Sequence, residues 1–508
     1  MYFPSSPAEE AVAAELAGVR PSLGPGYAAA LSGARAAVLT RLWRALAFEP
    51  LPWVVGRERG PDGLALLLAG GARLEGPLPD PYATEPYVSE LLLDGRAYGQ
   101  AAALVTALGP AHGKEFAAEL DGSTASLALS RAGRAPAGED AGEDAGPGAT
   151  WEWEQRVVDG HPYHPNCRSR PGFSVAEQLA YAPEHRPVVE LGLVAVPAEK
   201  CLVTGDWPES LQDSGRILVP VHPWQAAHVL RHERVLAGFA AHPLMALRTL
   251  APADGGPHVK TALSARLTSS VRDISVYSIE TAAAVSAFAQ GLSERLDGRL
   301  HITRTLGAAT AHTPDLAAVL REQPEVHADA AAGERVLPVA ALASFPPARS
   351  AAWRADFARL ALSVCLRVLE LGVALEAHGQ NLLVVLSATG APVRLVYRDL
   401  ADIRISPARL VRHGLPVPPL SGRLITDDVT VLRRKLFGSL LTGALGATAG
   451  SAGAFAEALA EVTSLPATAD TEALLTRPLP TKALTLMRLS PGIPGDQWAE
   501  LPNPLAGG

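Results

Sequence analysis

Two histidine–proline pairs stand three residues apart in the segment Gly160–Phe173, which also carries two arginines. Each proline removes an amide donor and clashes with a preceding helical turn, and it biases the residue before it toward extended backbone. We therefore expect a stiff, extended loop that presents His161, His164, Arg168 and Arg170. Guanidinium groups match carboxylate and phosphate oxygens, so this loop has the chemistry of an anion-binding site. The alternative is a proline-braced loop whose histidines only cap backbone groups.

A second group of polar residues lies on strand-like sequence further along the chain. Alternate residues of a strand share one face, so Thr268, Ser270 and Arg272 are expected to point together. Arg248 and Lys260 precede them and add two positive charges. A row of hydroxyls with cations suits a polyanion such as a triphosphate or a tricarboxylate. The alternative is an ordinary exposed sheet face.

A third group, Glu376–Asn381, follows a long apolar helix and precedes an apolar strand over 382–386. Its polar side chains need partners if they are buried, because an unpaired buried polar group is costly; otherwise they form a solvent-facing helix end. A second strand over 393–397 brings Asp399 about one hairpin away from Asn381. An amide oxygen and a carboxylate held in this way could bind Mg²⁺. The alternative for Asp399 is a turn-capping aspartate.

Composition narrows the classes of protein. The 508 residues are 48% hydrophobic and 19% charged, which is globular and enough for two to four domains. A net charge of −8 argues against general binding to nucleic acids or anionic membranes. Neither a signal peptide nor an apolar run of membrane-spanning length is evident, so we expect a soluble cytoplasmic protein. The scattered Cys167, Cys201 and Cys365 favour neither a disulfide framework nor a thiolate metal site.

Lysine is scarce, with five residues among 44 basic ones, at positions 114, 200, 260, 435 and 482. A lysine retained in an arginine-rich chain favours a position that needs a compact ammonium, and this argument singles out Lys260. Lys435 follows two arginines on a predicted helix and is expected to lie on its surface.

Hydrophobic periodicity predicts the elements that hold these groups. Residues 131–149 are low-complexity and are interpreted as a flexible loop. Helices are expected over 7–19, 27–48, 85–108, 175–181, 281–296, 351–375 and much of 423–508, and strands over 51–55, 64–68, 73–75, 188–196, 217–221, 382–386 and 393–397.

Together these motifs resemble those of the siderophore synthetases that work without a peptide-synthetase assembly line, the aerobactin-synthetase IucA/IucC family. The loop at 160–173 matches the family's His-Pro signature, and the other groups follow in the family's order. Segments 219–225, 482–488 and 503–505 add to the likeness, which covers about 151–505. Three residues depart from the family's pattern. Arg168 stands where lysine is common, which keeps the charge, and Ala401 stands where glycine is frequent. Ala246 stands where the family commonly has serine, so one hydroxyl contact to phosphate or substrate is missing there.

The resemblance implies an α+β fold shaped like a cupped hand. It has an N-terminal thumb (1–150), β-rich fingers (151–345) that carry the His-Pro loop, and a mainly helical palm (346–508). It also implies an ATP- and Mg²⁺-dependent enzyme, often a homodimer, that adenylates citrate or a related polycarboxylate. The acyl group then passes to an amine or hydroxyl, with release of AMP and pyrophosphate.

The resemblance also assigns roles to individual residues. Arg272, His378 and His164 are expected to be catalytic, and Asn381 and Asp399 to bind the metal ion. The expected substrate contacts are His161, His164, Thr268, Arg272, Glu376 and His378. The expected nucleotide contacts are Arg168, Arg170, Arg248, Lys260, Thr268, Gln380, Asn381 and Asp399.

Two other functions remain open. His378–Gly379 with Asn381, a hairpin and then Asp399 are similar to the catalytic loop and metal aspartate of small-molecule kinases. That loop, however, lacks an aspartate to accept a hydroxyl proton, and no glycine-rich loop precedes it. A non-catalytic protein that binds anions or iron chelates is the other alternative. The sequence names neither the acid nor the nucleophile.

Overall fold

A computed structural model describes residues 3–133, 148–267, 270–460 and 465–506. Helices and sheets are mixed along the chain, which confirms the α+β class. Within the described residues, no helix combines the length and apolar character needed to cross a membrane. Thr268, part of the segment 131–149 and the ends of the chain lie outside the described residues.

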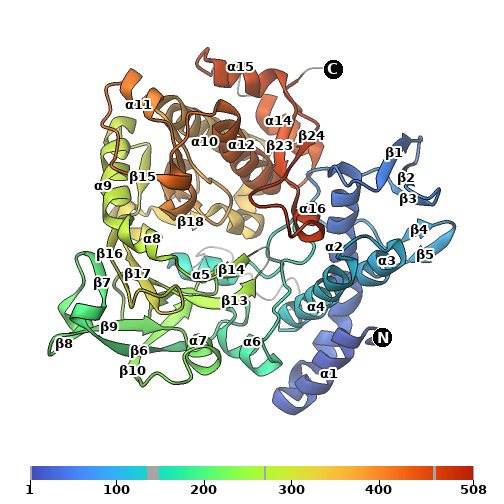
Figure 1. Ribbon diagram of the computed structural model, residues 1–508. Helices are drawn as coiled ribbons and strands as arrows, with labels where there is room; N and C mark the ends of the chain where they lie inside the picture. The colour runs from blue at the N-terminus through green and yellow to red at the C-terminus, as the bar shows by residue number, and fades with distance from the viewer. Residues whose placement is uncertain (1–2, 134–147, 268–269, 461–464, 507–508) are drawn as a thin grey trace.

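The N-terminal region pairs four helices with a five-stranded antiparallel sheet (Figure 1). Helix α2 carries the predicted apolar face and packs against α4, with Leu42 and Trp43 fully buried between them and the sheet. The helices are α1 (Pro7–Val19), α2 (Gly24–Phe48), α3 (Ala101–Leu108) and α4 (Gly113–Ala132), and the strands are β1 (Val54–Arg59), β2 (Gly63–Leu68), β3 (Arg73–Pro77), β4 (Leu91–Leu93) and β5 (Arg96–Tyr98).

The predicted helix over 85–108 is wrong in its first half, where the chain forms the β4–β5 hairpin. Asp94 and Gly95 make its tight turn, both with positive φ (48° and 80°). Asp-Gly is a strong two-residue hairpin signal because both residues tolerate that conformation. This local signal outweighs the apolar spacing, and only α3 is helical there.

A nine-stranded antiparallel sheet forms the middle region, in the order β7-β16-β17-β12-β11-β10-β6-β9-β8. Its strands are β6 (Val189–Pro197), β7 (Leu202–Gly205), β8 (Gln212–Asp213), β9 (Arg216–Val221), β10 (Val235–Pro243), β11 (Thr249–Pro252), β12 (His258–Thr261), β16 (Thr305–Thr310) and β17 (Ala317–Arg321). A separate hairpin, β13 (Leu263–Leu267) with β14 (Ser270–Arg272), lies toward the centre of the molecule (Figure 1). The region's helices are α5 (Thr150–Gln155), α6 (Val175–Tyr181), α7 (Pro223–His228), α8 (Val276–Glu280) and α9 (Ala282–Ser293).

The C-terminal region is mainly helical and surrounds a four-stranded sheet, β15-β21-β20-β18. Helix α10 ends at Leu371 rather than at 375, because Gly372 takes φ 116° and terminates it. The sheet strands are β15 (Leu300–Ile302), β18 (Arg335–Pro338), β20 (Leu382–Leu386) and β21 (Pro392–Tyr397). Two antiparallel strand pairs complete the region. They are β19 (Val373–Ala374) with β22 (Arg404–Ile405), and β23 (Leu479–Lys482) with β24 (Trp498–Leu501). The helices are α10 (Ala351–Leu371), α11 (Pro407–Arg412), α12 (Val429–Phe437), a π-helix (Gly438–Leu445), α13 (Gly446–Ala449), α14 (Ala452–Ala460), α15 (Ala469–Thr476) and α16 (Leu484–Leu489).

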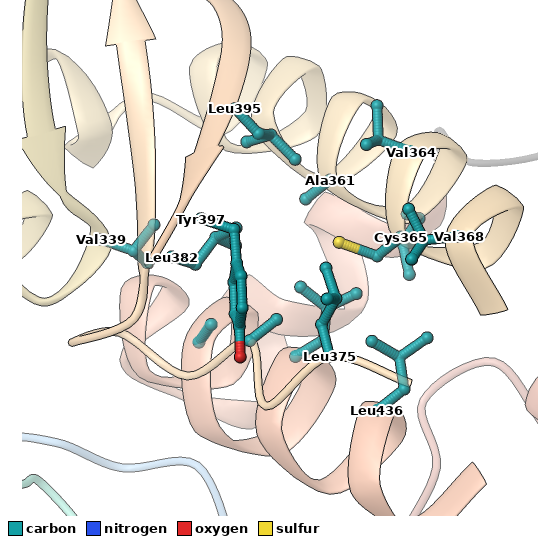
Figure 2. Close-up of a cluster of buried hydrophobic side chains, with 14 of the residues drawn as sticks. Val339, Ala361, Val364, Cys365, Val368, Leu375, Leu382, Leu395, Tyr397 and Leu436 are labelled. Carbon is teal, nitrogen blue, oxygen red and sulfur yellow. The ribbon is translucent and has the colours of Figure 1, made fainter. Parts of the chain in front are cut away.

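The core of this region packs α10 against the sheet (Figure 2). Cys365 and Val368 of α10 belong to one buried cluster with Leu382 and Leu395 of the sheet and Leu436 of α12. These side chains are almost fully buried, and burial of each is worth about 1.5–3 kcal/mol. The packed core thus fixes β20 and β21, whose ends carry Asn381 and Asp399.

Candidate active site

A large cavity of about 1720 Å³ opens where the three regions meet. Apart from Thr268, every predicted site residue lines it, although the residues are spread over more than 230 positions of the chain. They are His161, His164, Arg168, Arg170, Arg248, Lys260, Arg272, Glu376, His378, Gln380, Asn381 and Asp399.

The His-Pro loop is a succession of turns and not the extended segment that we expected. The amides of Cys167, Ser169 and Phe173 each donate to the carbonyl three residues earlier. Proline disfavours a helix but is common in such turns, because its ring fixes φ at the value that the turn requires. The loop therefore folds back on itself and gathers its polar groups over a short distance.

The N-terminal helices hold this loop in place. Ser123 Oγ of α4 accepts from the Arg168 amide (3.2 Å) and donates to the Pro165 carbonyl (3.0 Å). Arg41 of α2 donates to the Asp159 carbonyl at 3.1 Å and to Cys167 Sγ at 3.2 Å. The region with the weakest motif content thus positions the strongest motif.

His161 and His378 approach the cavity with the same local geometry. In each, Nδ1 accepts a hydrogen bond from the amide two residues later, Tyr163 and Gln380 respectively, at 3.2 Å. Burial lowers the pKa of both imidazoles. A neutral ring with Nδ1 occupied carries its proton on Nε2, so each histidine is a hydrogen-bond donor through Nε2. The capping role considered for the His-Pro loop is therefore observed at Nδ1, and it is compatible with the predicted anion-binding role of Nε2.

His164 is 4% exposed, and neither of its ring nitrogens makes a hydrogen bond to any described residue. Burial and the nearby Arg272, Arg488 and Arg41 lower its pKa to about 3. A buried polar group with no partner costs free energy, so its retention in a cavity wall indicates a ligand-facing role.

Arg168 and Arg170 are less available than predicted, since both lie against the buried Glu184. Arg170 contacts one carboxylate oxygen at 2.6 Å and Arg168 the other at 3.2 Å. Burial would raise the pKa of Glu184, but the two guanidinium groups lower it well below its usual range. Two cations share one carboxylate, so the loop keeps a net positive charge beside the cavity.

Asp399 lies between two cations from the nine-stranded sheet. Lys260 Nζ is 2.9 Å from Oδ2, and Arg321 is 2.8 Å from Oδ1. Asp399 has φ 73°, and its side chain also accepts from the Ala401 amide at 3.4 Å. The turn-capping alternative thus holds together with the ion pairs, and a left-handed aspartate is a conformation that functional sites often retain.

Arg248 completes this group. Its guanidinium donates to the carbonyls of Arg272 and of Asp273, the latter at 2.7 Å. Leu247 just before it has φ 68°, an unusual conformation for a bulky residue, which turns the chain into β11. We call Arg248, Lys260, Arg321 and Asp399 the cation cluster.

The basic groups of the cation cluster repel one another. Burial, together with Arg321 and Arg248, lowers the pKa of Lys260 to about 7 even though Asp399 acts in the opposite direction. Burial also lowers the pKa of Arg248, to about 10. Three cations face one carboxylate, so the cluster is electrostatically unsatisfied and suited to receive an anion.

A second charged group lies on the C-terminal side of the cavity. Glu376 accepts from Lys435 at 3.2 Å and from Lys482 at 3.0 Å. Lys435 is also 2.7 Å from Asp402, and Lys482 is 3.3 Å from Asp496. We call these five residues the carboxylate cluster, because three carboxylates meet two lysines there.

The prediction that Lys435 lies on a helix surface is wrong, because its side chain is only 3% exposed. Helix α12 turns this side chain inward to meet Glu376 and Asp402. Burial would raise the pKa of Glu376, but Lys482, His378 and Lys435 lower it to about 2. The lysine therefore serves to hold the Glu376–Asn381 segment.

Tyr397 connects the two clusters through the core. Its hydroxyl accepts from the Glu376 amide and donates to the Asp399 carbonyl, both at 3.2 Å. The ring packs among apolar side chains, with its oxygen at the edge of the cluster (Figure 2). Arg272, at the end of the β13–β14 hairpin, lies within reach of both clusters: burial lowers its pKa, and Glu376 and Asp399 oppose that shift.

The cavity-lining cations that were not assigned to the site from the sequence include Arg321, Lys435 and Lys482. Arg321 ends an apolar strand without any motif around it. Lysine scarcity was the available signal for Lys435 and Lys482, but it was applied only to Lys260.

Two family models match successive parts of the chain. A model of the IucA / IucC family matches residues 149–344, and a model described as a ferric iron reductase FhuF-like transporter matches 351–493. The chain is 24% identical over 319 residues to 2-[(L-alanin-3-ylcarbamoyl)methyl]-3-(2-aminoethylcarbamoyl)-2-hydroxypropanoate synthase of Staphylococcus aureus, covering 49% of this chain and 51% of the relative. The chain thus spans about half the length of the curated relatives that it matches.

Two solved structures share the fold over almost their whole length. The petrobactin biosynthesis protein AsbB of Bacillus anthracis has a TM-score of 0.77 and 17% identity, covering 99% of this chain and 98% of that one. ATP-bound aerobactin synthetase IucA of Klebsiella pneumoniae has a TM-score of 0.72 and 20% identity, covering 93% and 99%. Residues 149–344 thus match the IucA / IucC family, as the motifs predicted, and the chain as a whole shares the fold of these two solved proteins.

Proposed function

We propose that this protein is an ATP-dependent ligase of siderophore biosynthesis. It would activate a carboxylate of citrate or a related polycarboxylate as an acyl-adenylate and pass the acyl group to an amine or a hydroxyl. The excess of positive charge in the cation cluster, inside a cavity large enough for a nucleotide and an acid, carries the proposal. The IucA structure with bound ATP, and the relative whose name describes a hydroxy acid bearing two carbamoyl arms, support it.

The first chemical demand is to bring two anions together. A carboxylate must attack the α-phosphate of ATP, so cations have to offset their repulsion. Arg248 and Lys260 would bind the phosphates, and Arg168 and Arg170 add positive potential from the neighbouring loop although Glu184 holds them. Fixing both reactants in line contributes several kcal/mol to the rate.

The second demand is to stabilise the charge that develops as the bond to phosphorus forms. Arg272 is our choice for this centre, with His378 as a neutral donor through Nε2. His161 has the same donor geometry, and His164 has two unpartnered nitrogens, so these two would bind the acid. Gln380 would contribute through its backbone N–H, which donates to His378 Nδ1 and holds the ring in place.

Asn381 and Asp399 fit a magnesium ion whose remaining ligands would be water and phosphate oxygens. Among the described residues no group of three or more His, Cys, Asp or Glu could hold a metal ion. Asn381 donates its Nδ2 to the Glu376 carbonyl, which leaves Oδ1 as a ligand, and Asp399 supplies a carboxylate. One or two protein oxygens plus phosphate are the usual magnesium environment, and the ion would neutralise phosphate charge.

The test is to identify the products. The protein, ATP, Mg²⁺, a polycarboxylate and hydroxylamine should give a hydroxamate with AMP and pyrophosphate. Formation of ADP instead would support a phosphotransferase and refute the proposal. Homodimerisation, implied by the family resemblance, can be measured on the same sample by light scattering.

Ferric reduction is less well supported, despite the match to an FhuF-like model. Between 351 and 493 the sequence holds one cysteine, Cys365, and it is fully buried in the apolar core (Figure 2). Iron–sulfur clusters are bound by several thiolates, usually four. The matched region therefore lacks the thiolate ligands for such a cluster.

A further inference from the structure

Arg321 ends strand β17, next to the strand that carries Lys260. The antiparallel register pairs Arg321 with His258 and Val319 with Lys260, so the two cations are diagonal neighbours on one face. Each contacts a different oxygen of Asp399, Lys260 at 2.9 Å and Arg321 at 2.8 Å. Their side chains are 8% and 11% exposed, whereas that of Asp399 is 26% exposed. The carboxylate thus faces the cavity with a cation on each oxygen.

This arrangement conflicts with metal binding at Asp399. A divalent cation placed on either oxygen would lie within a few ångströms of an ammonium and a guanidinium, and like charges at that separation repel strongly in a partly buried site. Loss of both cations would leave the carboxylate unpaired in the absence of a metal, which is also unfavourable. The ion pairs therefore have to rearrange when a metal-bound nucleotide arrives.

We propose that Arg321 is a placeholder for the divalent cation: it neutralises Asp399 in the empty site and transfers to a nucleotide phosphate when the metal takes its place. The inference rests on the proposed use of ATP and Mg²⁺. Arginine suits the second role because its planar fork matches phosphate oxygens, and its long side chain can swing without movement of the strand. Lys260 remains beside Asp399 as the second, compact cation.

The first test measures metal binding without nucleotide or turnover. Mn²⁺ alone is titrated into the full chain and followed by electron paramagnetic resonance. Arg321→Gln should bind Mn²⁺ about tenfold more tightly than the unmodified protein, because one competing positive charge is gone. Arg304→Gln is the matched control. Arg304 pairs at 2.6 Å with Glu322, the residue that follows Arg321, and Arg304 does not line the cavity. Its Mn²⁺ affinity should be unchanged.

The second test measures nucleotide binding without metal. In the presence of EDTA, Arg321→Gln should bind ATP about tenfold more weakly by calorimetry, since the site loses one positive charge and Asp399 is neutralised by Lys260 alone, while Arg304→Gln should not differ. Equal Mn²⁺ affinity in Arg321→Gln and the unmodified protein, or equal metal-free ATP affinity, would overturn the inference. If Arg321→Gln does not fold, Arg321→Met, which also removes the charge, replaces it, and a Mn²⁺ affinity unchanged in that variant counts against the placeholder. Failure of ATP to bind the unmodified protein would instead refute the proposed function.

Discussion

The two charged clusters that line the cavity have opposite balances. In the cation cluster three basic groups meet one carboxylate, and in the carboxylate cluster two lysines meet three carboxylates. The pKa of a lysine therefore shifts in opposite directions in the two clusters. Burial and neighbouring cations lower the pKa of Lys260 to about 7, whereas Glu376 and Asp496 outweigh burial and raise the pKa of Lys482.

The difference separates two uses of buried charge. The carboxylate cluster satisfies itself and holds together segments from three parts of the C-terminal region, so its main effect should be on stability. The cation cluster is satisfied only when an anion arrives, so its main effect should be on binding and catalysis. Variants in the two clusters should therefore fail in different assays.

The largest effect is expected at Arg272, which lies within reach of both clusters. Arg272→Ala should lower the rate of adenylation about 10²–10³-fold, or about 2–4 kcal/mol, because charge developing at the α-phosphate loses a cation. Pyrophosphate release measures the rate, and thermal denaturation checks the fold. His378→Ala should behave similarly. Near-normal turnover in either variant would place the reaction centre elsewhere.

Lys435→Met should destabilise the protein by about 2 kcal/mol, because Glu376 and Asp402 lose a charged donor in a largely buried site. Urea unfolding measures this loss. Its Michaelis constant for ATP should change little, which distinguishes the carboxylate cluster from the cation cluster. A variant as stable as the unmodified protein but defective in ATP binding would reverse the roles assigned to the two clusters.

Lys260→Arg should raise the Michaelis constant for ATP about tenfold although the charge is kept, since a longer planar group would crowd Arg321 and Asp399. Lys200→Arg is the control, because Lys200 is exposed and lies outside the cavity, whereas Lys435 is buried. Equal Michaelis constants in the two variants would show that Lys260 needs no compact ammonium.

The smallest effect is a pH dependence. The pKa of Glu376 is lowered to about 2 in the folded protein from an ordinary value near 4.5, so its contribution to stability is complete above pH 4.5 and is lost as the pH falls toward 2. Between pH 5 and pH 3 the unmodified protein should lose on the order of 1 kcal/mol more stability than Glu376→Gln. Parallel pH profiles of the two proteins would contradict the strong pairing of Glu376 with the lysines.

The sequence was informative wherever local rules apply. Apolar periodicity predicted α6 over 175–181 and β20 over 382–386 with the bounds found in the structure, because their patterns follow directly from backbone geometry. The motifs were equally informative about the cavity, since polar residue types with chemical roles stand out against apolar surroundings. The sequence was misleading where two local signals compete, as in the hairpin at Asp94 and Gly95, and where burial decides the outcome, as at Lys435.

Only the tertiary structure decided which charges meet. Asp399 pairs with Lys260 and Arg321, which lie 139 and 78 positions away, and Lys435 meets Glu376 across 59. No periodicity encodes such distances, because they depend on how strands from two sheets and a buried helix face are brought together. The sequence by itself thus determined which chemical groups are present and on which elements, while packing decided their partners, their protonation and whether each remains available for a ligand.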